Sequence, residues 1–388
     1  MINLTRIWTG EEQPADALRY GRGKEAPVSA SCRKPVVVWN MTRTCNLHCA
    51  HCYSDSNPQH YQSEVTLSEA RSLIDDLVNY DVKHLLLSGG EPTMHPKFFT
   101  IAKYAAEKGL KLALSTNGTR LTRLRALRLR EIGFDYIGIS LDGIGLSNDR
   151  FRGTSGAFAR TLEGIHHCQT FGHKQGLRIT LTRENIYELD AFFRFIEHER
   201  IPRVCFYHLV PAGRGEVLDL PIPVETRGAI DLILLQVERW KKEGVRCEIL
   251  TVTQPADGAY LLWKLERDHS PRLQEAQELL RWNGGAAHGS GSGVANIDTQ
   301  GNVHPDQFTR FITLGNIRKK PFSAIWEQSR KTRPAGFENT REHLKGRCKT
   351  CRFLNACGGG LRSRAMLLTG DPWSSDPGCY LEDEMIAA

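Results

Sequence analysis

The stretch that decides the fold is VVVWNMTRTCNLHCAHCYS, residues 36–54. Its first part, residues 36–41, is a run of β-branched and aliphatic side chains that predicts a buried strand. Its second part places Cys45, Cys49 and Cys52 on one short loop directly after that strand. Three thiolates on so short a loop can converge on one face of an iron–sulfur cube and leave its fourth iron without a protein ligand.

The strand at 36–41 is the first of a series that alternates with stretches of helical period. Further short apolar runs predict strands at 84–88, 110–115, 136–140, 177–181 and 204–209. The intervening helices are predicted at 65–80, 96–108, 121–132, 157–171 and 187–199, where Thr66 and Glu69 make a capping box for the first of them. Six such units in succession predict an α/β fold with a parallel sheet and outer helices, either a partial (β/α)6 TIM-like barrel or a doubly wound sheet.

In parallel α/β folds, ligands bind at the carboxyl ends of the strands. Four of the predicted strands are followed by unusual residues at this end. The first strand leads into the cysteine loop, and the other three lead into polar, glycine-containing turns. These turns are Gly89-Gly90-Glu91-Pro92, Ser115-Thr116-Asn117-Gly118 and Ser140-Leu141-Asp142-Gly143. Packing alone does not explain four such turns at one rim, so we expect a ligand site there.

A second cysteine set lies near the C-terminus and consists of Cys348, Cys351, Cys357 and Cys379. Four thiolates suit a fully ligated iron–sulfur cluster, with zinc as the alternative. Zinc is also the alternative for the first loop, where His48 or His51 could complete four ligands. The four remaining cysteines are expected to be buried structural thiols, namely Cys32, Cys168, Cys205 and Cys247.

Length and composition describe an ordinary globular chain of 388 residues with a formal net charge of +7. No apolar run approaches the roughly 20 residues of a membrane span, and the first residues do not resemble an export signal, so we expect a cytoplasmic protein. The modest basic excess suggests an anionic ligand, and the chain lacks the dense basic and aromatic pattern typical of a nucleic-acid surface.

Four segments are expected along the chain. They are an N-terminal extension (1–34), the partial barrel (35–220), a helical connector (221–287) and a small cysteine-bearing domain (288–388) that opens with a hairpin of residues 294–297 and 302–304.

The cysteine loop and the three turns together resemble the radical SAM superfamily, whose signature is CxxxCxxC after the first strand of a partial barrel. The resemblance implies a [4Fe–4S] cluster on Cys45, Cys49 and Cys52, and S-adenosylmethionine bound at its open iron. The cofactor-binding residues that it implies are Gly89, Gly90, Glu91, Pro92, Ser115, Asn117, Ser140, Asp142 and Arg152. Glu91 would hold the amino group of S-adenosylmethionine and Arg152 its carboxylate. The implied chemistry is reductive cleavage that yields a 5′-deoxyadenosyl radical, which abstracts a substrate hydrogen; no catalytic side chain is identified from the sequence.

The C-terminal segment resembles the SPASM or twitch extension of the same superfamily, which houses auxiliary clusters. Asp306 and Leu361 stand where the full seven-cysteine pattern has cysteines, so the resemblance implies one auxiliary [4Fe–4S] cluster, on Cys348, Cys351, Cys357 and Cys379. Two clusters in all are therefore expected. An electron donor such as flavodoxin or ferredoxin is the implied partner.

The whole chain also resembles the tetrapyrrole-modifying branch of this superfamily. The stretches that carry this resemblance are 34–43, 295–306, 314–317, 369–373 and 376–381. It implies an anionic iron tetrapyrrole substrate, with removal of acetate side chains from 12,18-didecarboxysirohaem to give Fe-coproporphyrin III. Replacement of propionates, as in haem d1 synthesis, is the alternative; a peptide maturase and an electron-transfer protein are less favoured.

Three further side chains are candidates for contact with such a substrate. Arg214 is a candidate partner for a substrate carboxylate. His208 and His304 are candidate axial ligands, although a structural role is the more usual one for a histidine.

Overall fold

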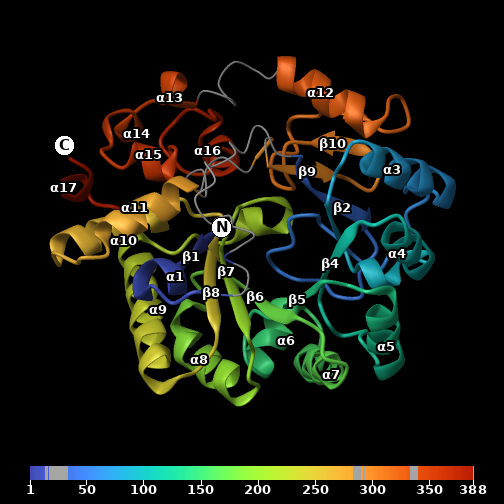
Figure 1. The fold of residues 1–388 in the computed structure, drawn as a ribbon, viewed down its shortest axis with the longest axis horizontal. Coiled ribbons are helices and arrows are strands. Elements are labelled where there is room, and N and C mark those ends of the chain that lie inside the picture. Colours follow the sequence, from blue (N-terminus) through green and yellow to red (C-terminus); the bar gives the residue numbers. More distant parts are fainter. Residues whose placement is uncertain (14–15, 17–33, 283–289, 292, 333–339, 388) are drawn as a thin grey trace.

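The computed structural model describes residues 1–388 apart from 14–15, 17–33, 283–289, 292, 333–339 and 388. Within the described residues, one 11-stranded sheet runs in the order β1-β8-β7-β6-β5-β4-β3-β2-β9-β10-β11. The stretch from β2 to β8 is parallel throughout. β2 and β8 are not neighbours in this order, so the parallel part forms an open, partial barrel as predicted (Figure 1).

The strands closely match the predicted ones. The parallel strands of the barrel are β2 (Val36–Thr42), β3 (His84–Gly89), β4 (Lys111–Thr116), β5 (Tyr136–Ser140), β6 (Gln175–Leu181), β7 (Arg203–His208) and β8 (Glu248–Val252). The remaining strands are β1 (Ile2–Asn3), β9 (Val294–Ile297), β10 (Asn302–His304) and β11 (Gly315–Asn316).

Helices lie outside the parallel strands (Figure 1). Those of the barrel region are α3 (Leu67–Asn79), α4 (Phe98–Glu107), α5 (Arg123–Ile132), α6 (Leu146–Arg152), α7 (Ala157–Thr170), α8 (Leu189–His198) and α9 (Pro223–Glu243). The others are α1 (Leu4–Thr9), α10 (Ala256–Arg267), α11 (Leu273–Trp282), α12 (Phe322–Thr332), α13 (Thr340–His343), α14 (Arg347–Thr350), α15 (Leu354–Cys357), α16 (Arg362–Thr369) and α17 (Asp383–Ile386). Short 3₁₀ turns occur at η2 (Pro92–Met94), η3 (Ile186–Glu188) and η4 (Gly213–Val217).

Local sequence signals explain these elements. The capping box at Thr66 is present, with Glu69 bonded back to the Thr66 backbone, and it sets the start of α3. Along β4, Leu112 and Leu114 are buried in the hydrophobic core while Ser115 remains partly accessible on the other face. This alternation gives the sheet one apolar face for the helices and one polar face for the barrel interior.

The prediction that residues 221–287 form a purely helical connector is wrong in one respect. This segment contains β8, a seventh parallel strand. β8 pairs with β7 in register Val204 to Ile249, and β1 pairs with β8 from the other side. The run EILTV is only five residues long and lies between long stretches of helical period, which masked its strand character in the sequence. The chain therefore continues the barrel past residue 220.

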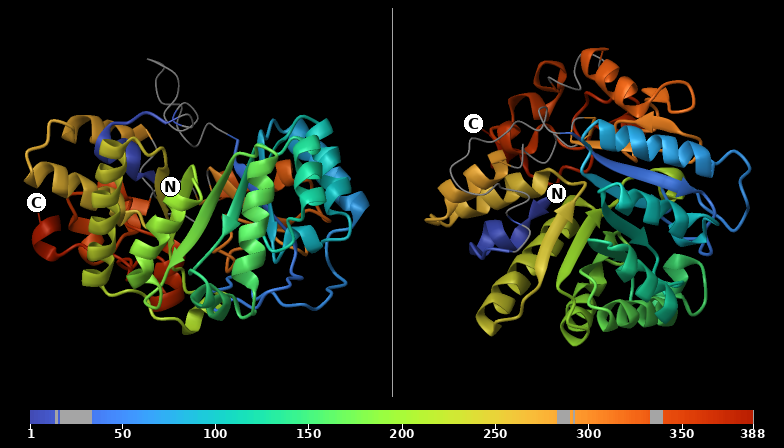
Figure 2. Two further views of the ribbon diagram at one scale, coloured as in Figure 1. Left: turned by 90° about the horizontal axis from the view of Figure 1, so that it is seen from below. Right: turned by 45° about the vertical axis from the view of Figure 1, so that its right-hand side comes forward.

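The C-terminal region contacts the barrel at several places, among them α3, where Ser323 bonds to Asp76. β9 pairs in parallel with β2 and forms the expected antiparallel hairpin with β10. Helix α15 contacts α10 and α11, so the C-terminal helices lie beside the helices that follow β8 (Figure 2). Among the described residues, no helix is long and apolar enough to cross a membrane.

Candidate functional site

The first cysteine loop follows β2 as predicted and brings its three thiols into one small cluster. Cys45 and Cys49 are buried with Leu47 and Ala157, and Cys52 packs against them. Burial raises the pKa of the Cys45 thiol to about 12 and raises that of Cys49, which the nearby Arg152 opposes. A metal is what stabilises thiolates in such an environment, and three convergent sulfurs fit one face of an iron–sulfur cube.

Helix α6 fixes this loop from one side. The backbone N–H of His48 donates to the carbonyl of Arg152 at 3.1 Å, and that of Ala50 donates to the carbonyl of Phe151 at 3.0 Å. The last carbonyls of a helix have no partner within the helix, so the loop supplies the donors that they lack. The helix end and the cysteine loop therefore stabilise one another.

Arg214, the candidate partner for a substrate carboxylate, fixes the loop from the other side. Its Nε donates to the Cys49 carbonyl and its backbone N–H to the Cys52 carbonyl, at 2.9 and 3.1 Å. Its Nη1 donates to Asp55 and to the Ser56 carbonyl, both at 2.9 Å. These bonds hold the guanidinium against the cysteine loop, while its buried Nη2 has no hydrogen-bond partner among the described residues.

The glycine turn after β3 packs directly on the start of the cysteine loop. The backbone N–H groups of Gly90 and Glu91 donate to the carbonyls of Thr42 and Thr44, at 2.6 and 2.9 Å. A Cβ atom at Gly90 would clash with the Thr44 carbonyl, and Gly89 has a φ of 138°. Only glycines allow this close approach of two backbones.

The Glu91 carboxylate has partners other than the expected amino group. It is 0% exposed and accepts hydrogen bonds from the Thr93 backbone and hydroxyl, from the Thr116 hydroxyl and from the Asn117 backbone. Burial raises the pKa of Glu91, and these donors oppose that rise. The side chain thus joins the turn after β3 to the turn after β4, and the backbone of the glycine turn is the part left to meet a ligand.

Asn117 in the turn after β4 reaches the first cysteine. Its Nδ2 donates to Asn46 Oδ1 at 3.0 Å and lies 3.9 Å from Cys45 Sγ. Its Oδ1 accepts from the backbone and hydroxyl of Thr119. The turn after β4 is therefore connected to the cysteine loop, as expected for turns that share one rim of a parallel sheet.

Arg152 and Asp142 form a buried ion pair next to the second cysteine. Arg152 Nη1 donates to Cys49 Sγ at 3.5 Å, and its Nη2 pairs with Asp142 Oδ2. Asp142 Oδ1 accepts from the Thr180 backbone at 2.6 Å, and His51 Nε2 lies 3.4 Å from Asp142 Oδ2. Arg152 Nε has no hydrogen-bond partner in the described part of the chain, and such a buried donor fits a bound carboxylate.

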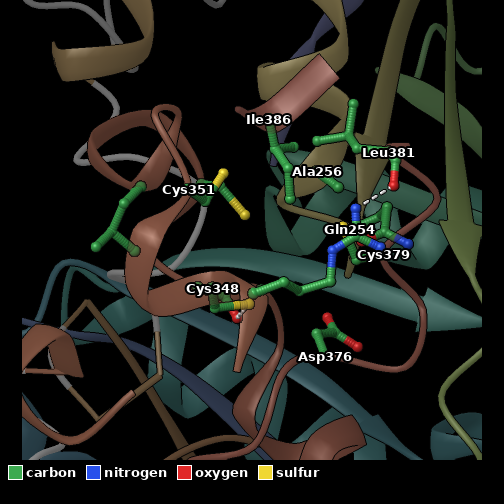
Figure 3. A pocket seen from close by; sticks show the side chains of 13 residues that line it. Gln254, Ala256, Cys348, Cys351, Asp376, Cys379, Leu381 and Ile386 are labelled. Atoms are coloured by element: carbon green, nitrogen blue, oxygen red, sulfur yellow. Dashed lines mark hydrogen bonds between the residues drawn. The ribbon is translucent and has the colours of Figure 1, made fainter. Parts of the chain in front are cut away.

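The four C-terminal cysteines line a single cavity, as their spacing predicts. The cavity is also lined by Gln254 and Asp376 (Figure 3). Burial raises the pKa of Cys379 to about 11 and raises that of Cys357 well above its usual value. Four thiols that line one cavity suit a fully ligated iron–sulfur cluster.

A buried arginine that no sequence motif marks connects this cavity to the barrel. Arg364 binds Asp376 through two hydrogen bonds of 2.7 Å, and both side chains are about 1% exposed. Its Nη2 also donates to Gln254 Oε1 at 3.0 Å, and Gln254 donates to the Gly378 carbonyl. Gln254 lies just after β8, so this network fixes the cysteine region to the seventh strand.

Both candidate axial histidines have structural partners, and the lone thiols behave as expected. His208 Nε2 lies 3.0 Å from Asp257, while the ring nitrogens of His304 lie 2.8 Å from the Ile312 carbonyl and 3.3 Å from Asp298. The lone thiols within the described residues are buried, namely Cys168, Cys205 and Cys247. Cys32 lies outside the described residues. Among those that are described, no group of His, Cys, Asp and Glu side chains is arranged to hold a single metal ion.

The open barrel, the three-cysteine loop at its rim and the separate four-cysteine cavity define an enzyme class with two iron–sulfur centres. Comparison with known families agrees: residues 39–196 match the radical SAM superfamily and residues 290–352 match an iron–sulfur cluster-binding domain, SPASM.

The chain is similar to named proteins over most of its length. The chain is 43% identical over 397 residues to Fe-coproporphyrin III synthase of Methanosarcina barkeri, covering 100% of this chain and 99% of that protein. It is 42% identical over 366 residues to pre-heme d1 synthase of Dinoroseobacter shibae, covering 90% and 86%. The fold is similar to that of Streptococcus suis SuiB bound to S-adenosylmethionine, with a TM-score of 0.68, 14% identity and coverage of 89% and 77%.

The chain belongs to the radical SAM superfamily and is a radical SAM enzyme with a SPASM domain. It uses S-adenosylmethionine and a [4Fe–4S] cluster, and the SPASM domain adds an auxiliary iron–sulfur cluster.

Proposed function

We propose that this enzyme removes the acetate side chains of 12,18-didecarboxysirohaem and so produces Fe-coproporphyrin III. The observation that carries this proposal is the similarity to Fe-coproporphyrin III synthase, which extends over 100% of this chain and 99% of that protein. Replacement of propionates, with a product of the haem d1 type, is the second candidate because pre-heme d1 synthase is 42% identical. The longer alignment favours the first reaction over the second.

We further propose which cysteines bind each of the two iron–sulfur clusters. Cys45, Cys49 and Cys52 would bind the cluster with the open iron, and this cluster supplies an electron for cleavage of S-adenosylmethionine. The loop contacts of Arg214 and of helix α6 would keep the three sulfurs in place. The cysteines of the second set, Cys348, Cys351, Cys357 and Cys379, would bind the auxiliary cluster.

The S-adenosylmethionine site would lie at the rim formed by the three turns after β3, β4 and β5. The backbone of Gly89–Pro92 would meet the amino group, because its glycines bring the chain closest to the cysteine loop. Arg152 would meet the carboxylate through its unpartnered Nε. Ser115, Asn117, Ser140 and Asp142 would complete the site on the neighbouring strands.

We also propose the setting of the reaction. A small electron-transfer protein such as flavodoxin or ferredoxin would supply the electron, since reductive cleavage requires one. A reducing compartment, the cytoplasm, suits seven clustered thiols. Residues 1–34 would form an N-terminal extension. Residues 288–388 would form the unit that holds the auxiliary cluster.

Mass spectrometry of the macrocycle tests the proposed reaction. Anaerobically reduced holoenzyme is incubated with S-adenosylmethionine and 12,18-didecarboxysirohaem, and the products are followed over time. Two successive acetate losses that end at Fe-coproporphyrin III are expected. Incorporation of oxygen would favour the haem d1 reaction, and an unchanged macrocycle together with 5′-deoxyadenosine release would contradict both.

A further inference from the structure

Arg178 occupies an unusual position on the polar face of the sheet. It lies on β6 beside Ser140 of β5, and its Nη1 donates to the Ser115 hydroxyl on β4. The side chain therefore crosses β5 to reach β4. It crosses at Gly138, where a Cβ atom would lie 2.5 Å from Arg178 Nε, so the absent side chain makes room for the guanidinium.

The charge of Arg178 has no anionic partner in the described part of the chain. Arg178 is half-buried and differs in this from the buried Arg152 and Arg364, which pair with Asp142 and Asp376. The described neighbours of Arg178 are neutral: the Ser115 hydroxyl and the ring of Tyr207, whose centroid lies 5.8 Å from the guanidinium carbon. A half-buried guanidinium without a counter-ion is a suitable partner for an anionic ligand.

A second group near Arg178 also has no partner. The hydroxyl of Tyr136 is buried and has no hydrogen-bond partner among the described residues. It lies over Gly176 of β6, where a Cβ atom would clash with it. Gly138 pairs with Gly176, and the Tyr136 hydroxyl lies over Gly176 while the Arg178 guanidinium lies over Gly138, so the two groups share one face of β5 and β6. A hydroxyl donor beside a guanidinium is a suitable pair for a carboxylate.

We propose that Arg178, together with the Tyr136 hydroxyl, binds a carboxylate side chain of the substrate inside the barrel. This inference rests on the proposed function, because that substrate is a polycarboxylate. S-adenosylmethionine also has a carboxylate, but the two arginines have different surroundings. Arg152 contacts Cys49 and Asp142, beside the cluster loop. The described contacts of Arg178 are the Ser115 hydroxyl on β4 and the ring of Tyr207 on β7. Arg178 thus lies over strands β4 to β7 and has no described hydrogen bond to the cysteine loop.

Two separate binding measurements on the reconstituted holoenzyme test this assignment. The first titrates Fe-coproporphyrin III and follows its visible absorption, and the second measures binding of S-adenosylmethionine. The variants are R178Q, R178K and G138A, and the last one displaces the guanidinium without changing its charge. The matched control is R183Q, which removes an arginine just beyond β6 whose side chain is 48% exposed.

R178Q is expected to weaken Fe-coproporphyrin III binding by about 10- to 100-fold, the usual effect of losing a charge-assisted pair. It should weaken S-adenosylmethionine binding far less, because there it removes only the contact with the Ser115 hydroxyl. R178K and G138A should show smaller losses of the same kind, and R183Q should match the wild type.

Equal porphyrin affinity in R178Q and wild type would overturn the proposal, as would loss of S-adenosylmethionine binding instead. If R178Q does not retain its clusters, G138A decides in the same way. A wild-type enzyme that binds no Fe-coproporphyrin III would refute the proposed function first, and with it this assignment.

Discussion

Replacing Glu91 by glutamine tests whether this side chain joins two turns of the rim or contacts the co-substrate. The carboxylate is fully buried and accepts from the Thr93 and Asn117 backbones and from two hydroxyls. In E91Q an amide nitrogen must replace one oxygen. It would then face the N–H of Asn117 or that of Thr93, so at least one buried donor loses its acceptor.

The size of the effect follows from these contacts. One buried donor without an acceptor costs about 1–3 kcal/mol, and the remaining bonds lose the extra strength that a charged acceptor gives them. Because burial of the carboxylate raises its pKa, the neutral amide also relieves part of a desolvation cost. We therefore expect E91Q to lower the free energy of unfolding by about 2–4 kcal/mol.

The assay is urea unfolding of the holoenzyme under anaerobic conditions, followed by circular dichroism and by cluster absorbance. E107Q is the matched control, because Glu107 lies on the outer surface of α4 with its side chain 60% exposed. E91Q should unfold at clearly lower urea than E107Q and lose the first cluster sooner. A stable E91Q that only binds S-adenosylmethionine more weakly would refute the reasoning. It would indicate instead that the Glu91 carboxylate binds the amino group of S-adenosylmethionine.

Three further predictions concern the cysteine sites. Serine at any one of Cys348, Cys351, Cys357 or Cys379 should remove the auxiliary cluster and lower the iron content of the holoenzyme by about half, measured per chain; a full iron content would contradict the four-cysteine assignment. R214M should accelerate loss of the first cluster in air, because the Cys49 carbonyl loses its donor, and a rate equal to that of R183Q would contradict the role of Arg214. Since burial raises the pKa of Cys45 to about 12 and of Cys379 to about 11, both thiols carry protons at neutral pH without metal. Cluster loading should therefore release protons and strengthen as pH rises from 6 to 9, roughly tenfold per pH unit for each such thiol, and pH-independent loading would contradict this.

The sequence predicted the parallel strands and the two cysteine sets because both depend on local signals. Strand periodicity and turn residues are local, and the carboxyl ends of parallel strands necessarily share one rim. The positions of Cys45, Glu91 and Asn117 after three such strands are therefore enough to predict that the three residues lie at the same rim.

What the sequence could not give is where long side chains point. Arg214 turns towards the cysteine loop and Arg178 crosses β5, and both depend on contacts between residues far apart in the chain. β8 was missed because a five-residue strand between long helices carries little periodicity. The Arg364–Asp376 pair depends on how α16 packs beside the last loop, which no local pattern encodes.

The most direct test of the central claim is release of 5′-deoxyadenosine in step with acetate loss. Reduced holoenzyme, S-adenosylmethionine and 12,18-didecarboxysirohaem are mixed anaerobically, and nucleoside and macrocycle are quantified in the same samples, with the C45A/C49A/C52A variant as control. The account predicts that both products accumulate together and that the variant forms neither. Acetate loss in the variant, or a wild type that leaves S-adenosylmethionine intact, would contradict it.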